Sequence, residues 1–272
     1  MPVPMSDRDL VRFSEWIATV SGVRLDASKR YLLESRLDPV LREGRCADYD
    51  ELYTRVKSGK ERALEKRLID AITTNETFFF RDLKTFELLR HKVVPELLGE
   101  DLQKPVSIWS AACSTGQEAY SITMVLEELL FDLAKCRIRI LGTDISESVV
   151  AAASKGEFNP LELSRGLVQK QITKYFVPSG RGHKIRDDLR GLCRFQVDNL
   201  LSPATSGQFD IVLCRNVLIY FSAQDKIKVL HNLLSRLKRG GVLLIGSTES
   251  LLGLTDRVER REFHGASYYV PR

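Results

Sequence analysis

The chain has 272 residues, a formal net charge of +5 and 43% apolar residues. This length holds one large domain, or a large domain and a small one, and the mild charge permits an acidic partner without requiring nucleic acid. The 5 cysteines are scattered without a C-x-x-C pair, which argues against structural zinc and for a reducing, cytoplasmic compartment. Charged residues begin at Asp7 and no apolar run approaches about 20 residues, so we expect neither a secretory signal nor a membrane span.

The first part of the chain, from residue 6 to about 73, predicts helices only. Apolar residues recur there at helical spacing between polar residues that can cap a helix and glycines that can end one. The residues that mark these ends are Ser6 with Asp9, Gly22, Asp26, Gly44 and Asp48. The last of the four expected helices runs through Leu64, Leu68, Ile69 and Ile72. This segment therefore predicts a small helical bundle.

Basic residues lie on the outward faces of the second and fourth expected helices. They are Lys29, Arg30, Arg36, Arg42, Arg45, Arg62, Lys66 and Arg67. Because acidic residues are interspersed among them, a solvated face is one interpretation. The other interpretation is a docking surface for an acidic helix.

A polar run and three phenylalanines connect this bundle to the rest of the chain, from Thr73 to Arg81. One interpretation is a helix stop followed by an apolar linker. The other is a polar edge that lines a pocket, with Arg81 placed to meet a carboxylate. Asp82 is then expected to cap a helix that runs through Phe86 to Val94.

An α/β part begins at Val106. Alternating apolar residues to Trp109 predict a buried parallel strand, small residues follow, and helical spacing resumes after Gly116. This is the first unit of a nucleotide-binding sheet, although the loop keeps one glycine and not the full G-x-G-x-x-G. A carboxylate at Glu118 would repel a pyrophosphate, so a cationic ligand without phosphate, such as S-adenosylmethionine, fits better. A tight turn without ligand is the alternative.

A second strand runs from Arg137 to Asp144, which lies 28 positions after Gly116 (144 − 116). An acidic residue at such a strand end accepts the ribose hydroxyls in nucleotide-binding sheets. The alternative is that Asp144 only caps the helix beginning at Ser146.

The middle of the chain predicts an antiparallel insert at about residues 174–197, after helices over 148–155 and 161–175. Turns are expected at Gly180–Gly182 and near 187–191, and the insert should end with the strand Cys193–Val197. Asn199 and Leu200 follow that strand, where polar groups can bind an adenine edge.

The segment Phe209–Cys214 predicts a central strand. Arg215 and Asn216 follow at its carboxyl end, which faces the ligand in open α/β sheets, and Tyr220 is either a pocket wall or a core aromatic. A helix over 226–237, a turn at 239–241, a strand over 242–246 and an edge strand at 268–270 should complete the sheet. The four histidines are dispersed, and we expect no metal site.

Four segments together carry a family resemblance. They are Asn75–Arg81 (NETFFFR), Trp109–Ser121, Gly142–Asp144 and Cys214–Tyr220 (CRNVLIY). The chain resembles the CheR-type chemoreceptor glutamate O-methyltransferases of bacteria over nearly its whole length. The resemblance implies an N-terminal all-α domain (1–76) and a Rossmann-like methyltransferase domain (77–272) with a small antiparallel β-subdomain.

The resemblance also implies a reaction and its site. S-adenosylmethionine would donate a methyl group to receptor glutamates, leaving S-adenosylhomocysteine, and Arg81 and Tyr220 would lie near the transferred methyl. The implied cofactor site consists of Asn75, Thr77, Arg81, Glu118, Asp144, Asn199, Leu200, Arg215 and Asn216.

The expected partners are the cytoplasmic methylation helices of chemoreceptors, bound by the helical domain of a monomer recruited to receptor arrays. Some members of the family grip a receptor's C-terminal pentapeptide through the β-subdomain. The loop from Ser179 to Lys184 is compact here, so we expect independence from that tail.

Three other functions remain open at this point. The chain could methylate nucleic acid or a small molecule, although Arg215-Asn-Val-Leu stands where amino-methylases carry Asn/Asp-Pro-Pro-Tyr/Phe. It could sense S-adenosylmethionine and dock on receptors without catalysis. An NAD-type enzyme is disfavoured by the missing glycines and by Glu118.

Overall fold

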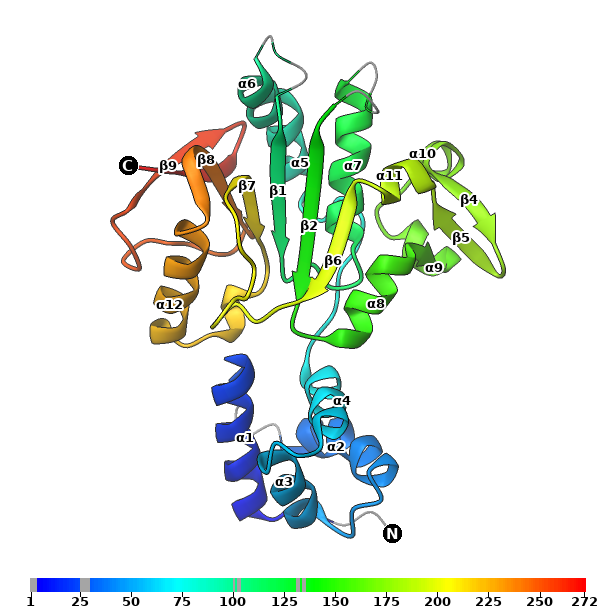
Figure 1. Ribbon diagram of the computed structural model, residues 1–272, viewed down its shortest axis with the longest axis vertical. Coiled ribbons are helices and arrows are strands. Elements are labelled where there is room, and N and C mark those ends of the chain that lie inside the picture. Colours follow the sequence, from blue (N-terminus) through cyan, green and yellow to red (C-terminus); the bar gives the residue numbers. More distant parts are fainter. Residues whose placement is uncertain (1–3, 25–29, 100, 102–103, 131–132, 134–135) are drawn as a thin grey trace.

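The computed structural model describes residues 4–24, 30–99, 101, 104–130, 133 and 136–272. A helical domain lies below a large sheet that helices cover (Figure 1). The described part of the chain contains no helix with the length and apolarity needed to cross a bilayer. It also contains no group of three side chains suited to holding a metal ion.

The N-terminal domain is the predicted bundle of helices. Its members are α1 (Asp7–Ser21), α2 (Arg30–Glu43), α3 (Tyr49–Lys57) and α4 (Arg62–Ile72). The capping box of Ser6 and Asp9 is present, Gly22 ends α1 in a left-handed conformation, and Asp48 caps α3 as expected. The proposed cap Asp26 lies outside the described residues.

The core of this domain is separate from the cores around the sheet. It runs from Met5 to Ile72, whereas the sheet's cores begin at Phe79. Only the polar first part of the connecting segment, residues 73–77, belongs to neither core, because Phe79 and Phe80 are buried in the sheet's core. The exact division at 76/77 stays a prediction.

The large sheet has 7 strands in the order β6-β2-β1-β7-β8-β10-β9. The strands are β1 (Val106–Ala111), β2 (Ile138–Asp144), β6 (Cys193–Val197), β7 (Phe209–Cys214), β8 (Leu237–Ile245), β9 (Val258–Phe263) and β10 (Ala266–Pro271). The first five in the order pair in parallel, and β10 is antiparallel to both of its neighbours. Every residue of β7 is buried, as a strand covered on both faces requires.

Helices cover both faces of this sheet. They include α5 (Leu83–Leu88), the π-helical η2 (Leu89–Val93), α6 (Val94–Leu98), α7 (Gln117–Leu129), α8 (Glu147–Lys155), the 3-10 helix η4 (Leu218–Tyr220) and α12 (Ala223–Leu234). Ile108 belongs to the core under α5 and α7, and its neighbour Trp109 to the core under α12, because successive side chains of a strand point to opposite faces. The predicted fold class is confirmed.

The small antiparallel sheet is present, but it begins earlier than the predicted 174–197 and has different strands. This sheet has 3 strands in the order β3-β5-β4. They are β3 (Glu157–Phe158), β4 (Phe176–Ser179) and β5 (Gly182–Ile185), with α9 (Pro160–Ser164), α10 (Gln169–Tyr175) and α11 (Asp187–Arg190) around them. The hairpin at Gly180 is as predicted, but the turn expected near 187–191 is the helix α11.

Three strand predictions were wrong. Cys193–Val197 does not end the insert, because β6 pairs in parallel with β2 at the edge of the large sheet. The turn expected at 239–241 lies within β8, which begins at Leu237. The strand predicted at the edge of the sheet, at 268–270, belongs to β10, which lies between β8 and β9. The edge strand is β9, which the sequence did not predict.

Candidate functional site

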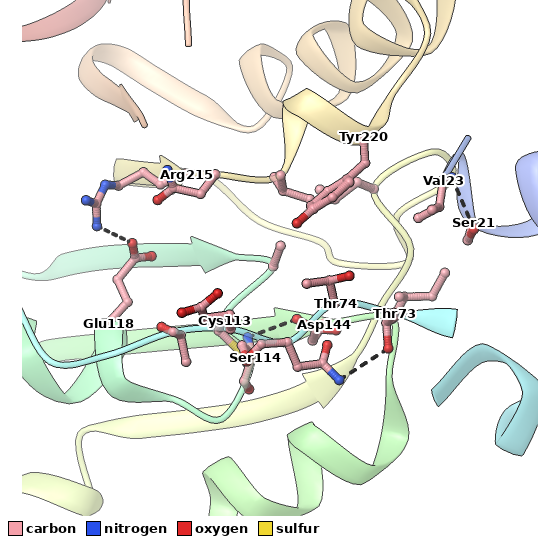
Figure 2. Close-up of a pocket in the computed structure, with 18 of the residues that line it drawn as sticks. Ser21, Val23, Thr73, Thr74, Cys113, Ser114, Glu118, Asp144, Arg215 and Tyr220 are labelled. Atoms are coloured by element: carbon pink, nitrogen blue, oxygen red, sulfur yellow. Dashed lines mark hydrogen bonds and ion pairs between the residues drawn. The ribbon is translucent and has the colours of Figure 1, made fainter. Parts of the chain in front are cut away.

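A cleft open to solvent lies at the carboxyl ends of the central strands. The end of α1 and the connecting segment after α4 close its other side (Figure 2). Every site residue expected from the sequence lines this cleft: Asn75, Thr77, Arg81, Glu118, Asp144, Asn199, Leu200, Arg215, Asn216 and Tyr220. The sequence therefore located the cleft, and the chemistry of each residue can be read from its contacts.

Asp144 ends β2 on the floor of the cleft. Its Oδ2 accepts from the Ser114 amide at 2.9 Å and its Oδ1 from the Ser146 amide at 3.1 Å. Burial raises the pKa of Asp144, and these backbone hydrogen bonds oppose the rise. Each oxygen keeps acceptor capacity for a ligand hydroxyl. Helix α8 has Ser146, not Asp144, as its N-cap, so the capping alternative does not account for Asp144.

The loop after β1 replaces most of the usual glycines with other small residues. Ala112 and Ser114 adopt left-handed backbone conformations, with φ of 61° and 49°, as does Gly116. A hydrogen bond of 2.8 Å from the Ser114 hydroxyl to the Asn75 carbonyl joins this loop to the connecting segment. The connecting segment is thus a wall of the cleft, in agreement with the second interpretation of the polar run.

Arg215 is buried between two carboxylates. Its Nη1 lies 2.8 Å from Glu118 Oε2 and its Nη2 lies 2.8 Å from Asp82 Oδ2, while the side chain is only 2% exposed. Asp82 therefore does not cap α5 with its side chain, as the sequence had suggested, because its carboxylate turns to Arg215. One guanidinium between two carboxylates leaves a net negative charge, which suits a cationic ligand without phosphate.

Arg81 and Tyr220 lie near the opening. Arg81 donates to the Glu76 carbonyl at 2.9 Å and lies over the Phe78 ring at 5.6 Å, which leaves other guanidinium donors free. Figure 2 shows the Tyr220 ring reaching into the cleft. The structure thus favours the pocket wall over the core aromatic for this residue.

Asn199 has a different contact from the one expected. Its side-chain amide donates to the Val20 carbonyl at 2.7 Å, and its side-chain oxygen accepts from the Leu201 amide at 2.9 Å. The side chain therefore joins the sheet to the end of α1.

The sequence missed several residues that line the cleft. Ser21 and Val23 come from the end of α1, and Thr73 and Thr74 from the start of the connecting segment. The polar run contained the two threonines, so that signal was present. Nothing in the sequence of α1 distinguishes Ser21 and Val23 from an ordinary helix end.

Two family models match this architecture domain by domain. The model described as "CheR methyltransferase, all-alpha domain" matches residues 8–73, and "CheR methyltransferase, SAM binding domain" matches residues 75–266. The chain belongs to the CheR methyltransferase family. The family predicted from the four motifs is therefore confirmed.

Curated relatives in this family cover most of the chain. It is 39% identical to the "Chemotaxis protein methyltransferase Cher2" of Pseudomonas putida, over 92% of this chain and 93% of that one. It is 40% identical to the "Chemotaxis protein methyltransferase" of Vibrio parahaemolyticus, over 94% of each chain. It is 37% identical to the "Chemotaxis protein methyltransferase 1" of Pseudomonas aeruginosa, over 93% and 94%.

This CheR protein is accordingly a methyltransferase that uses S-adenosylmethionine. The cleft fits that cofactor, because Asp144 has acceptor capacity for hydroxyls and the cluster of Arg215, Glu118 and Asp82 is net negative. The loop after β1 lacks the glycine-rich sequence that binds phosphate groups in other nucleotide-binding sheets. S-adenosylmethionine carries no phosphate group, so this loop is compatible with it.

Proposed function

We propose that this CheR protein methylates glutamate side-chain carboxylates of bacterial chemoreceptors, giving methyl esters that serve adaptation in chemotaxis. One observation carries the proposal: among the described residues that line the cleft none is a histidine or a lysine, and the carboxylates of Glu76, Glu118, Asp144 and Asp198 are all held by hydrogen bonds. A glutamate acceptor is already ionised at neutral pH, with an ordinary pKa of about 4.3, and needs no general base. An amine acceptor would have to lose a proton first.

The residues proposed to hold the donor surround the cleft floor. When bound, S-adenosylmethionine supplies a methyl group on an electrophilic sulfonium. Asp144 would accept ribose hydroxyls, and Glu118, held by Arg215, would face the ammonium group. The whole proposed set is Asn75, Thr77, Arg81, Glu118, Asp144, Asn199, Leu200, Arg215 and Asn216.

Arg81 and Tyr220 are the proposed catalytic residues on the acceptor side. Arg81 would hold the acceptor carboxylate through its free guanidinium donors without protonating it. Tyr220 would shape the methyl pocket and orient one carboxylate oxygen. Catalysis would then consist of positioning and the exclusion of water.

The helical domain is the proposed docking surface for acidic methylation helices. Most of its basic residues already have partners, such as Arg30 with Asp7 and Lys66 with Glu147. The exposed Arg45 and Arg62 make no ion pair with any residue that the structure describes. These two guanidinium groups, together with exposed pairs that can exchange partners, support an acidic partner.

The β-subdomain supports docking without a receptor tail. Its β4–β5 hairpin has a compact turn at Gly180 and Arg181. We therefore propose a monomer in the cytoplasm that is recruited to receptor arrays through the helical domain and does not depend on a C-terminal pentapeptide. Receptors truncated by five residues should be methylated at the rate of intact ones.

The test is transfer of tritiated methyl from S-adenosylmethionine to receptor-rich membranes. We expect label on the receptor that is released as methanol by mild base, because an ester hydrolyses and an N-methyl group does not. Base-stable label would point to a different acceptor. Binding of the donor with no transfer to any receptor would point to the non-catalytic sensor.

A further inference from the structure

A carboxylate outside the cleft closes the ends of two neighbouring strands. Glu249, in the loop after β8, accepts with Oε2 from the Gly246 amide at 2.7 Å and from the Asn216 amide at 2.9 Å. Asn216 follows β7 and Gly246 follows β8, and these strands pair in parallel up to Cys214 and Ile245. Glu249 Oε2 thus accepts hydrogen bonds from both chains just after the backbone pairing of β7 and β8 ends.

The backbone around this oxygen is tightly constrained. Asn216 has a left-handed φ of 57°, a conformation that costs energy for a residue with a side chain. A Cβ on Gly246 would lie 2.7 Å from Glu249 Oε2 and 2.9 Å from the Asn216 side-chain nitrogen. At such distances a Cβ at 246 would force Glu249 or Asn216 to shift. The turn at Asn216 is therefore fixed by its contacts with the Glu249 carboxylate and Gly246.

Arg215, the residue before Asn216, makes hydrogen bonds on both sides of the cleft. Arg215 pairs with Glu118 on the donor side, and it donates to the Arg81 carbonyl and to Asp82 on the acceptor side. The direction in which Arg215 leaves β7 depends on the backbone at Asn216. Substitution of Glu249 would therefore alter the positions of both Arg81 and Glu118.

We propose that Glu249 is a positioning residue for methyl transfer, which sets the Arg215–Asn216 turn and through it the places of Glu118 and Arg81. This inference rests on the proposed function for its acceptor side only. Glu249 itself touches neither ligand, since it does not line the cleft. It lines instead a second hollow with Thr248 and Ser250.

The proposal requires that residue 249 present an oxygen that accepts the two backbone hydrogen bonds. Variants that keep or remove this oxygen therefore test it. Glu249→Ala removes the acceptor and leaves two backbone amides without a partner. Glu249→Gln keeps a carbonyl oxygen that can accept from both. Gly246→Ala keeps Glu249 and displaces its oxygen. Thr248→Ala, two residues away from Gly246 and exposed, is the matched control.

The experiment measures S-adenosylhomocysteine affinity by calorimetry and kcat and KM for receptor methylation, at a temperature where each variant is fully folded. We expect Glu249→Ala and Gly246→Ala to weaken affinity and lower kcat by about tenfold each, as a displaced binding and positioning group would. Glu249→Gln and Thr248→Ala should stay within about threefold of the unmodified protein.

Two outcomes would overturn the proposal. In one, Glu249→Ala melts at a lower temperature but keeps affinity and kcat when folded, so its role is structural only. In the other, Glu249→Gln loses as much as Glu249→Ala, so acceptance of the two hydrogen bonds is not what matters. Affinity for S-adenosylhomocysteine decides both cases even if receptors prove not to be the acceptor, so failure of the proposed function is seen separately.

Discussion

Arg215 Nη1 lies 2.8 Å from the Glu118 carboxylate, and both side chains are nearly excluded from solvent. The pair joins the end of β7 to the first turn of α7, so one interaction fixes two of the elements that bound the cleft. Removing one partner of such a pair leaves a buried charge without compensation, which costs far more than losing an exposed pair.

Arg215→Ala should therefore lower the free energy of unfolding by about 3 kcal/mol or more and abolish S-adenosylhomocysteine binding. Urea denaturation and calorimetry measure the two effects. The control is Arg67→Ala, which removes the exposed ion pair with Glu43 and should cost less than about 1 kcal/mol. Similar losses in the two variants would contradict the buried role of Arg215.

The donor affinity should weaken in acid because of Asp144. Its pKa is raised by burial, so in the folded state Asp144 takes up a proton at a higher pH than an exposed aspartate, whose pKa is about 3.9. The protonated acid is a poorer acceptor for ribose hydroxyls. Calorimetric titrations at decreasing pH should show S-adenosylhomocysteine affinity falling through that raised pKa.

The same shift has the opposite sign for folding. Because the folded pKa lies above the unfolded one, the ionised Asp144 opposes folding at neutral pH, and this cost fades as pH falls from the folded pKa towards the unfolded one. Asp144→Asn should bind the ligand weakly with no such pH dependence. A wild-type affinity that stays constant until the pH reaches the ordinary aspartate pKa of about 3.9 would count against the assignment.

Arg81→Ala should slow the chemical step far more than Asp144→Ala does, by about 100-fold in single turnovers at saturating donor, because Arg81 is proposed to hold the acceptor and Asp144 is not. Rapid quenching of labelled methyl transfer measures this step. Arg165→Ala is the control, because Arg165 also lies over Phe78, at 5.4 Å, but is paired with Glu76. Equal single-turnover losses in Arg81→Ala and Asp144→Ala would sink the division of roles.

Asn199→Ala should loosen the end of α1 from the sheet. It removes the hydrogen bond to the Val20 carbonyl, and amide hydrogen exchange near Gly22 should become faster, with donor affinity lowered by about threefold to tenfold. Asn232→Ala is the control, because Asn232 donates to the carbonyls of Leu200 and Leu201 without contacting α1. Equal exchange near Gly22 in the two variants would show that Asn199 does not anchor the helix.

The sequence predicted elements well where local signals determine them. Caps and glycines gave the helical bundle, and apolar runs gave the central strands up to Asp144 and Cys214. Pairing partners were harder, because the alternation in Cys193–Val197 is compatible with either sheet. Only the contact with β2, more than 40 residues earlier, assigns it to the large one.

The site was predictable in its membership and less so in its contacts. Motifs placed Arg215, Asp82 and Asn199 near strand or helix ends, but not their partners. The Asp82 carboxylate reaches an arginine 133 positions later, and the Asn199 amide reaches a helix 179 positions earlier. Such pairings are set by the tertiary fold, and no local pattern contains them.

The end of α1 is a wall of the donor cleft and is fastened there by the Asn199 contact and by the Arg24 amide, which donates to the Tyr220 carbonyl at 3.2 Å. A partner that binds the helical domain and moves α1 would therefore also change the affinity for the donor. Thermodynamic reciprocity then requires that bound donor change the affinity for that partner by the same factor. For the chemoreceptor proposed as the partner, this means that receptor binding and donor binding would be coupled through the end of α1.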